Sequence, residues 1–237
     1  MTFYRTIGAL ILAASVTVVS GTDGRAGDVR LSSNIGGAVT VPVLSYQARP
    51  FLTVVRQEHD FSCGSAAVAT LLTYHYDRRT TEREAFEAMY ATGDKAKIQR
   101  EGFSLLEMKT YLESLGYHAD GFRVSLEKVA RVGVPVIVLI ETRGYKHFVV
   151  IKGLLDDRVL VGDPARGVAV MTRPDFLKLW KDGIVFAIHN DDAIGRRHFN
   201  VAAEWTLRPP SPVGAGIDRS GLASFTVMLP GALSTFQ

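Results

Sequence analysis

The spacing of hydrophobic residues changes once along the chain. Between residues 63 and 115, apolar side chains recur at helical spacing, as Ala67, Leu71 and Tyr74 do. Between residues 117 and 189 the period is two, which predicts a series of strands. Helices therefore precede strands, and this order predicts an α+β domain rather than a doubly wound parallel sheet.

Three helices are predicted in the first of these regions. The helix that begins at Cys63 is rich in alanine and leucine. The other two each follow a capping box, in which a threonine or serine and a glutamate three residues later bind the free N–H groups of the first turn. These boxes are Thr81 with Glu84 and Ser104 with Glu107. The predicted helices are 63–76, 82–90 and 105–115, the last ended by Gly116.

The strands predicted in the second region are short and separated by turn residues. They pack with the helices into one domain, in which we expect the helix that begins at Cys63 to lie against an antiparallel sheet. The predicted strands are 117–124, 134–142, 148–154, 158–162, 168–171 and 184–189, with short helices at 126–132 and 174–181.

The N-terminal residues have the pattern of a secretory signal. One positive charge precedes residues 7–19, an unbroken run of 13 apolar and small residues, and polar residues follow. A membrane-spanning helix needs about 20 apolar residues, so this run favours a cleaved signal, with cleavage after Gly21 or Ala26, over a retained anchor. We therefore expect a periplasmic or secreted protein with no transmembrane domain beyond this segment.

Composition shifts suggest the remaining boundaries. A loose stretch with Pro42 precedes residue 51, and a proline- and glycine-rich linker begins at Arg208. The expected organisation is a signal peptide at 1–26, a lead-in arm at 27–50 with one edge strand at 38–44, a domain at 51–190, and a partly loose C-terminal extension at 191–237 with at most one short strand at 225–229.

The charge and the cysteine content exclude several classes of function. A net charge of +3, from 27 basic and 24 acidic residues, provides no stripe for binding phosphates, so we expect no nucleic-acid partner. The single cysteine excludes an internal disulfide and a thiolate-rich metal site, and no glycine-rich phosphate loop is present. We expect no cofactor and no metal. Because the chain has no second cysteine, Cys63 must act with residues of other types.

Cys63 is a candidate nucleophile because of its position. The start of a helix lowers the pKa of a thiol through the helix dipole and unpaired N–H groups. Gln57, six residues upstream, is a candidate oxyanion donor together with the Cys63 N–H. Gly64 would let a substrate backbone approach closely. In the alternative interpretation Cys63 is a small buried hydrophobe and Gln57 a surface amide.

A thiolate nucleophile needs an imidazole, and the best candidate of six histidines is His147. It precedes an apolar strand, and Asp163 closes the next strand. If residues 155–157 form the hairpin loop, position numbers across the pair sum to 312, which places Asp163 opposite Val149 and diagonal to His147. A carboxylate there would orient the imidazole and stabilise its charged form. The alternatives are a structural histidine and a turn aspartate.

These residues resemble a known family. Gln57, Cys63-Gly64 with its alanine-rich helix, His147-Phe-Val-Val and Gly162-Asp163-Pro164 are similar to the motifs of the bacteriocin-processing cysteine peptidases, which cleave double-glycine leaders. The resemblance covers about residues 54–189 and implies a papain-like fold. It implies that Cys63 is the nucleophile, His147 the general base and acid, Asp163 the orienting group and Gln57 an oxyanion donor.

The sequence departs from this family in two respects. Ser62 stands where many members have aspartate before the cysteine, and no exporter domains accompany the peptidase. A stand-alone exported form resembles the peptidases of functional-amyloid and other secretion gene clusters. The expected function is therefore cleavage of a peptide bond after small residues, such as Gly-Gly, in a secreted protein or secretion-system component, including a co-encoded amyloid protein. The alternative is a non-catalytic peptide-binding chaperone or assembly factor on the same fold.

Overall fold

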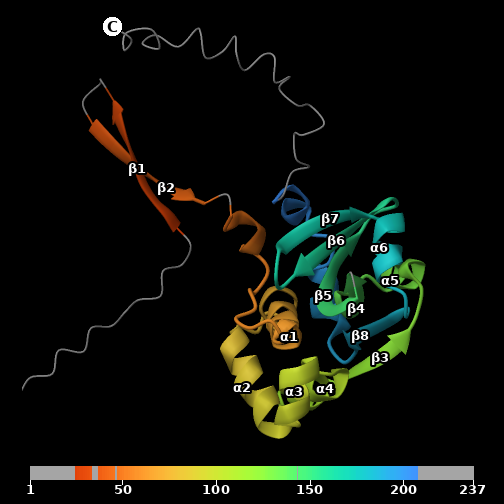
Figure 1. Cartoon of the computed structure of the whole chain (residues 1–237). Coiled ribbons are helices and arrows are strands. Elements are labelled where there is room, and N and C mark those ends of the chain that lie inside the picture. Colours follow the sequence, from red (N-terminus) through yellow and green to blue (C-terminus); the bar gives the residue numbers. More distant parts are fainter. Residues whose placement is uncertain (1–24, 34–36, 46, 143, 208–237) are drawn as a thin grey trace, which may run out of the picture. The chain divides into compact units, whose positions relative to one another are not determined.

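The computed structural model describes residues 25–33, 37–45, 47–142 and 144–207. The predicted signal segment before residue 25 and the predicted strand at 225–229 lie outside these ranges. The chain divides into two units, residues 1–45 and residues 46–237, and Figure 1 shows their elements. Among the described residues, no helix is long and apolar enough to cross a membrane.

The first unit contains an antiparallel hairpin of β1 (Arg25–Ser33) and β2 (Gly37–Leu44). The sequence pattern predicted one edge strand, at 38–44, so β1 is a correction. Only Val29 and Leu31 alternate as apolar residues in β1, which is a weak signal by itself. Their positions pair with Val41 and Val39 of β2, and pairing with a neighbour decides strand formation more than propensity does.

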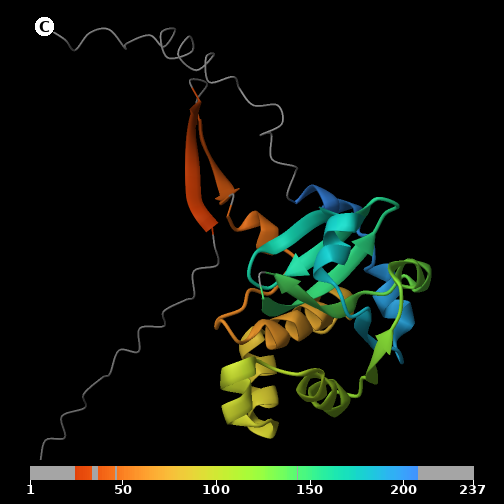
Figure 2. The same ribbon diagram turned by 45° about the vertical axis from the view of Figure 1, so that its right-hand side comes forward.

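The second unit begins with helices, whose starts agree with the predicted caps. Both capping boxes are formed, Thr81 with Glu84 and Ser104 with Glu107. The helices are η1 (Arg49–Phe51), α1 (Cys63–His75), α2 (Glu82–Thr92), α3 (Lys95–Glu101) and α4 (Leu105–Ser114). Figures 1 and 2 show α2, α3 and α4 gathered at the end of the domain away from β6 and β7.

Helix α3 was not predicted. It is polar and buries one residue, Ile98, so it carries no periodic hydrophobic signal. The Asp94 carboxylate caps it by accepting a hydrogen bond from the Lys97 N–H at 3.1 Å. A local cap and one buried contact therefore form this helix.

A six-stranded antiparallel sheet follows, in the order β3-β8-β4-β5-β6-β7. The structure confirms the predicted α+β class, with α1 packed on β5 and β4. The elements are β3 (Ala119–Arg123), α5 (Leu126–Val132), β4 (Val136–Thr142), β5 (Tyr145–Leu154), β6 (Arg158–Asp163), β7 (Gly167–Thr172), α6 (Arg173–Leu179) and β8 (Ile184–Ile188).

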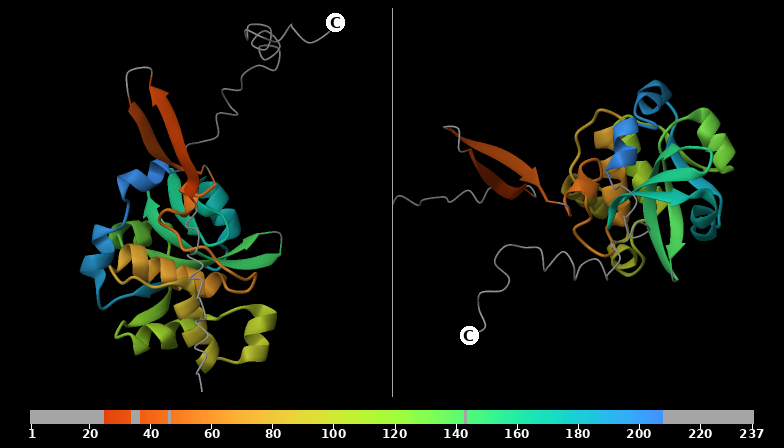
Figure 3. Two further views of the ribbon diagram at one scale, coloured as in Figure 1. Left: turned by 90° about the vertical axis from the view of Figure 1, so that its left-hand side faces the viewer. Right: turned by 90° about the horizontal axis from the view of Figure 1, so that it is seen from above.

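The sheet is covered on both faces, as Figure 3 shows. On one face Ile137, Phe148 and Val150 pack with residues of α1, α2 and α4. On the other face Val136 and Val149 pack with residues of α5 and α6. The strands that carry the candidate site are therefore held from both sides, and β5 and β6 lie inside the sheet rather than at its edge.

The predicted C-terminal extension begins with two helices, α7 (Asp192–Arg197) and η2 (Ala202–Thr206). Between them, Asn200 joins this segment to the end of β5. Its side-chain oxygen accepts a hydrogen bond from the Leu154 N–H at 2.7 Å, and its amide donates to the Leu154 carbonyl at 3.0 Å. Residues up to 207 are therefore packed on the sheet, although their short elements carry little periodicity.

Candidate active site

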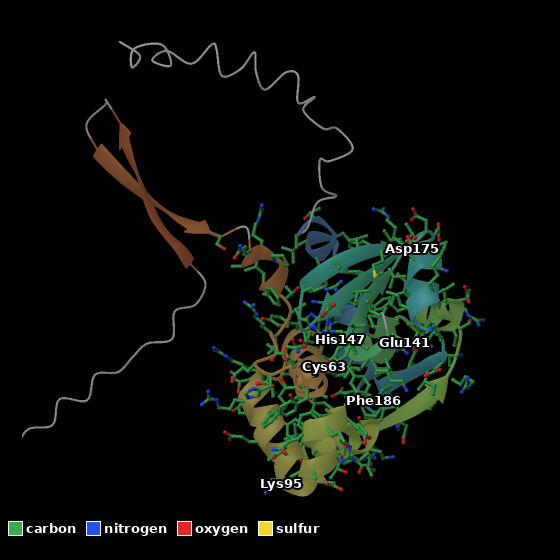
Figure 4. All side chains as sticks on the ribbon, in the orientation of Figure 1. Cys63, Lys95, Glu141, His147, Asp175 and Phe186 are labelled. Atoms are coloured by element: carbon green, nitrogen blue, oxygen red, sulfur yellow. The ribbon has the colours of Figure 1, made fainter. Side chains whose placement is uncertain are left out.

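The side chains of Cys63, His147 and Asp163 lie together inside the domain. Cys63 is the first residue of α1, His147 is the third of β5, and Asp163 ends β6. Figure 4 shows Cys63 next to His147 where α1 meets the sheet. The exposed fractions of the three residues are 5%, 7% and 9%, so the proposed nucleophile and its partners are shielded from bulk water.

The loop before Cys63 leaves the start of α1 without a side-chain cap. Ser62 occupies the cap position, but its hydroxyl binds His59 instead, accepting from the N–H at 3.1 Å and donating to the carbonyl at 3.0 Å. Ser62 therefore fixes this turn, at the position where many members of the resembled family have aspartate. The first N–H groups of α1 remain without this cap, which suits a site that stabilises negative charge.

Gln57 lies in the same loop and is hydrogen-bonded to the turn that follows Asp163. Its N–H donates to the Pro164 carbonyl at 3.1 Å, next to Asp163, and its side-chain amide nitrogen donates to the His59 carbonyl at 2.9 Å. An amide nitrogen carries two hydrogens, so one N–H remains for a ligand. Gln57 thus links the loop that precedes Cys63 to the turn that follows Asp163.

His147 and Asp163 form a direct hydrogen bond. His147 Nε2 lies 2.7 Å from Asp163 Oδ1, which also accepts from the Ala165 N–H at 2.8 Å. His147 Nδ1 is buried and has no hydrogen-bond partner within the described residues, although Cys63 is one of the groups that raise the pKa of the ring. The carboxylate therefore orients the ring through one nitrogen and leaves the other without a partner.

The register that brings His147 to Asp163 agrees with the prediction, and the strands end and begin on either side of residues 155–157 as predicted, but the residue pairing predicted at this loop is wrong. Near the site, Val150 pairs with Gly162, so position numbers sum to 312. At the loop, Leu154 pairs with Val159 rather than with Arg158. A bulge at Lys152 shifts the register by one residue between the two ends. The pairing error at the loop and the unpredicted bulge cancel at the site.

Burial and hydrogen bonding act oppositely on the two ionisable groups. Burial by itself lowers the pKa of His147, but its interactions with Asp163 and Cys63 outweigh this and raise the pKa to about 9. Burial raises the pKa of Asp163, yet the His147 hydrogen bond and the Ala165 N–H hold it below its ordinary value. Because the folded-state pKa of His147 lies above 6.5, its charged form stabilises the fold fully below that pH, and this contribution is lost as the pH rises through about 9.

Gly64 has a packing role in the structure. A β-carbon at this position would lie 2.8 Å from Met108 Cε and 3.0 Å from Phe103 Cβ. Met108 Cε is the flexible end of a side chain and can shift, but Phe103 Cβ is fixed to its backbone, so glycine favours close packing of α1 against the segment that begins α4.

Tyr145 belongs to the site and was not predicted. It lies two residues before His147, hence on the same face of β5, and the two ring centroids are 6.1 Å apart. Its hydroxyl donates to the Asp60 carbonyl at 2.6 Å. The spacing of two residues from His147 was the only sequence signal for this position, because Asp60 is 85 residues away.

No three His, Cys, Asp or Glu side chains in the described part of the chain gather into a group that could hold a metal ion. The ionisable side chains of the site instead satisfy one another, as the His147–Asp163 hydrogen bond illustrates. The arrangement suits nucleophilic chemistry by a thiol and an imidazole.

A family model and two relatives from Pseudomonas agree on one family. The model of the peptidase C39 family matches residues 52–192. A relative from Pseudomonas fluorescens, named probable functional amyloid protease FapD, is 40% identical over 191 residues, which are 80% of this chain and 81% of that protein. FapD from Pseudomonas aeruginosa is also 40% identical, over 76% of each chain. The peptidase domain of Streptococcus ComA aligns with a TM-score of 0.49 and 20% identity, covering 57% of this chain and 96% of that domain.

Proposed function

This chain belongs to the peptidase C39 family, and we propose that it is an exported cysteine endopeptidase whose catalytic residues are Cys63, His147 and Asp163. Family membership makes it a cysteine peptidase. The observation that carries the assignment of residues is the 2.7 Å contact of His147 Nε2 with Asp163 Oδ1, which leaves the buried Nδ1 without a partner and available to the thiol. Retention of these groups in one buried cluster favours catalysis over a purely binding role.

The proposed reaction starts with the proton of Cys63 Sγ on His147 Nδ1. The thiolate sulfur bonds to the carbonyl carbon of the scissile peptide, and the carbonyl oxygen takes up negative charge beside the Cys63 N–H and the Gln57 amide. Protonated Nδ1 then gives its proton to the leaving amine as the C–N bond breaks, and the acyl group stays on sulfur. Neutral His147 deprotonates a water molecule, which releases the acyl group and regenerates the thiol.

The proposed substrate is a secreted protein or a secretion-system component, cut after small residues such as Gly-Gly. Two observations support a small residue at the cleavage point: the resemblance of the motifs and the near burial of Cys63 and His147. The relatives named as functional amyloid proteases support a co-encoded amyloid protein as the partner. The pattern of residues 1–26 supports export to the periplasm or beyond.

Purified protein is expected to cleave an internally quenched peptide after an internal Gly-Gly. Replacing the two glycines by valines should lower kcat/KM about 10²-fold or more, because Cys63 and His147 are nearly buried and branched side chains beside the scissile bond would hinder its approach to them. Mass spectrometry of the products locates the cut. Equal cleavage of both peptides would contradict the specificity, and cleavage that survives complete alkylation of Cys63 would contradict the thiol mechanism.

Asp163→Asn is expected to move the alkaline limb of the pH profile to lower pH. The asparagine can still accept the Nε2–H bond, but without the carboxylate charge the pKa of His147 falls from about 9, and the charged pair with the thiolate is lost sooner as the pH rises. Asp163→Ala should lower kcat more, by about 10²- to 10⁴-fold. The measurement is kcat/KM against pH. A profile of Asp163→Asn that superimposes on the wild-type profile would make Asp163 a turn residue only.

A further inference from the structure

A tyrosine bridges the two sides of the candidate active site. Tyr145 stands two residues before His147, on the strand that carries the imidazole. Asp60 stands three residues before Cys63, in the loop that carries the thiol. The Tyr145 hydroxyl donates to the Asp60 carbonyl at 2.6 Å. This hydrogen bond therefore joins the imidazole side to the cysteine side next to the reactive pair.

The ring of Tyr145 lies beside the imidazole of that pair. Its centroid lies 6.1 Å from the His147 ring, with 30° between the planes, and burial, with a smaller contribution from Cys63, raises the pKa of its hydroxyl. Tyr145 is 52% exposed, whereas Cys63 and His147 are 5% and 7% exposed. An exposed ring thus lies beside a nearly enclosed thiol.

The exposure of Tyr145 argues against a core-packing role. A side chain that keeps half of its surface in water contributes little hydrophobic stabilisation. The preceding Gly144 has φ +81° and no atom within 4 Å of where a β-carbon would lie, so the turn before Tyr145 has open space around it. The hydroxyl contact with Asp60, rather than burial, therefore holds the ring where it is.

We propose that Tyr145 is a specificity-determining residue, a tethered ring that admits to Cys63 only those peptides whose residues at the scissile bond have no bulky side chain. This inference rests on the proposed function and extends it to the choice of substrate. The peptide backbone must pass beside the ring to bring its carbonyl carbon to Sγ. Glycine leaves that path free, whereas a branched or aromatic side chain would meet the ring and must break the bond to Asp60.

Alkylation of the thiol tests whether the Tyr145 ring limits access to Cys63, and it does not require catalysis. Cys63 is the only cysteine of the chain, so the reaction reports on this site alone. The probes are iodoacetamide and its fluorescein derivative, which share one chemistry and differ in size. We expect Tyr145→Ala to raise the rate for the large reagent relative to the small one about 10-fold or more. Tyr145→Phe keeps the ring but loses the tether, so the same ratio should rise about 2- to 10-fold.

The matched control is Phe122→Ala, which removes an aromatic side chain that is 42% exposed on β3, at the edge of the sheet. Its ratio of alkylation rates should equal that of the wild type. Melting temperatures of all variants establish that they are folded. An unchanged ratio in folded Tyr145→Ala would overturn the proposal.

Peptide cleavage then tests the consequence for specificity. Tyr145→Ala should cleave the Val-Val peptide with kcat/KM raised about 10-fold or more relative to the Gly-Gly peptide, and Tyr145→Phe should show a smaller change. If the wild type cleaves no peptide while the alkylation ratios change as expected, the proposed function is wrong, but control of access to Cys63 by Tyr145 is supported. If wild-type cleavage is confirmed but Tyr145→Ala keeps the wild-type preference, the specificity role is wrong.

Discussion

Cys63→Ala is expected to abolish peptide cleavage, with a loss in kcat on the order of 10⁶-fold. Alanine cannot form the bond to the scissile carbonyl, and His147 then has no nucleophile to activate. Cys63→Ser should be nearly as inactive, because a serine hydroxyl has a much higher pKa and does not yield a stable anion beside the imidazolium. The measurement is product formation from the Gly-Gly peptide over hours, with protein in stoichiometric amounts.

The fold should survive these changes. Cys63 is buried at the first position of α1, and alanine and serine are close to cysteine in size, so the free energy of unfolding should change by about 1 kcal/mol or less. Circular dichroism and thermal unfolding serve as the control. Undiminished cleavage by folded Cys63→Ala would refute the assignment of the nucleophile and with it the mechanism proposed above.

Glu204→Gln is expected to lower the free energy of unfolding by about 1 to 3 kcal/mol. The reason lies in Lys152, which is 1% exposed and forms a salt bridge with Glu204 at 2.6 Å. Its ammonium also donates to the carbonyl and hydroxyl of Thr53. Burial lowers the pKa of Lys152, and the opposite charge of Glu204 limits the fall to about 8. Without that charge the buried ammonium is uncompensated. Urea unfolding at pH 7 measures the loss.

A double variant separates the charge from the packing. Lys152→Met with Glu204→Gln removes both charges and retains an unbranched chain beside Gly162, where a β-carbon would lie 2.9 Å from Lys152 Cδ. Replacing a buried ion pair by apolar groups is often close to neutral, so the double variant should recover most of the stability lost by Glu204→Gln. A loss below about 1 kcal/mol in Glu204→Gln alone would show that the pair is not needed.

The Lys152–Glu204 pair also bears on the extent of the domain. The family match ends at residue 192, but Glu204 lies in η2, beyond that limit, and neutralises a lysine of the central sheet. We therefore expect the peptidase unit to require the segment up to residue 207. Asn200 and Glu204 make the contacts that attach this segment to the sheet. Neither lies in a run of periodic hydrophobic residues, which would have predicted an element packed on the sheet.

Local chemistry could be predicted from the sequence. The starts of α2 and α4 follow from Thr81 with Glu84 and from Ser104 with Glu107, because a capping box involves residues three positions apart. The α+β order follows from the change of hydrophobic period. The start of α1 at Cys63 and the position of His147 and Asp163 on neighbouring strands follow from the same pattern.

Contacts between distant residues could not be predicted, because local patterns in one sequence do not reveal which separate segments meet. The bulge at Lys152 corrects a register that the loop alone would have set wrongly. The bond from Tyr145 to Asp60 and the pair of Lys152 with Glu204 join residues that are 85 and 52 positions apart. The sequence by itself thus determined the kinds of element and the residue types of the site. The tertiary structure decided the partners, since packing and burial set their distances and pKa values.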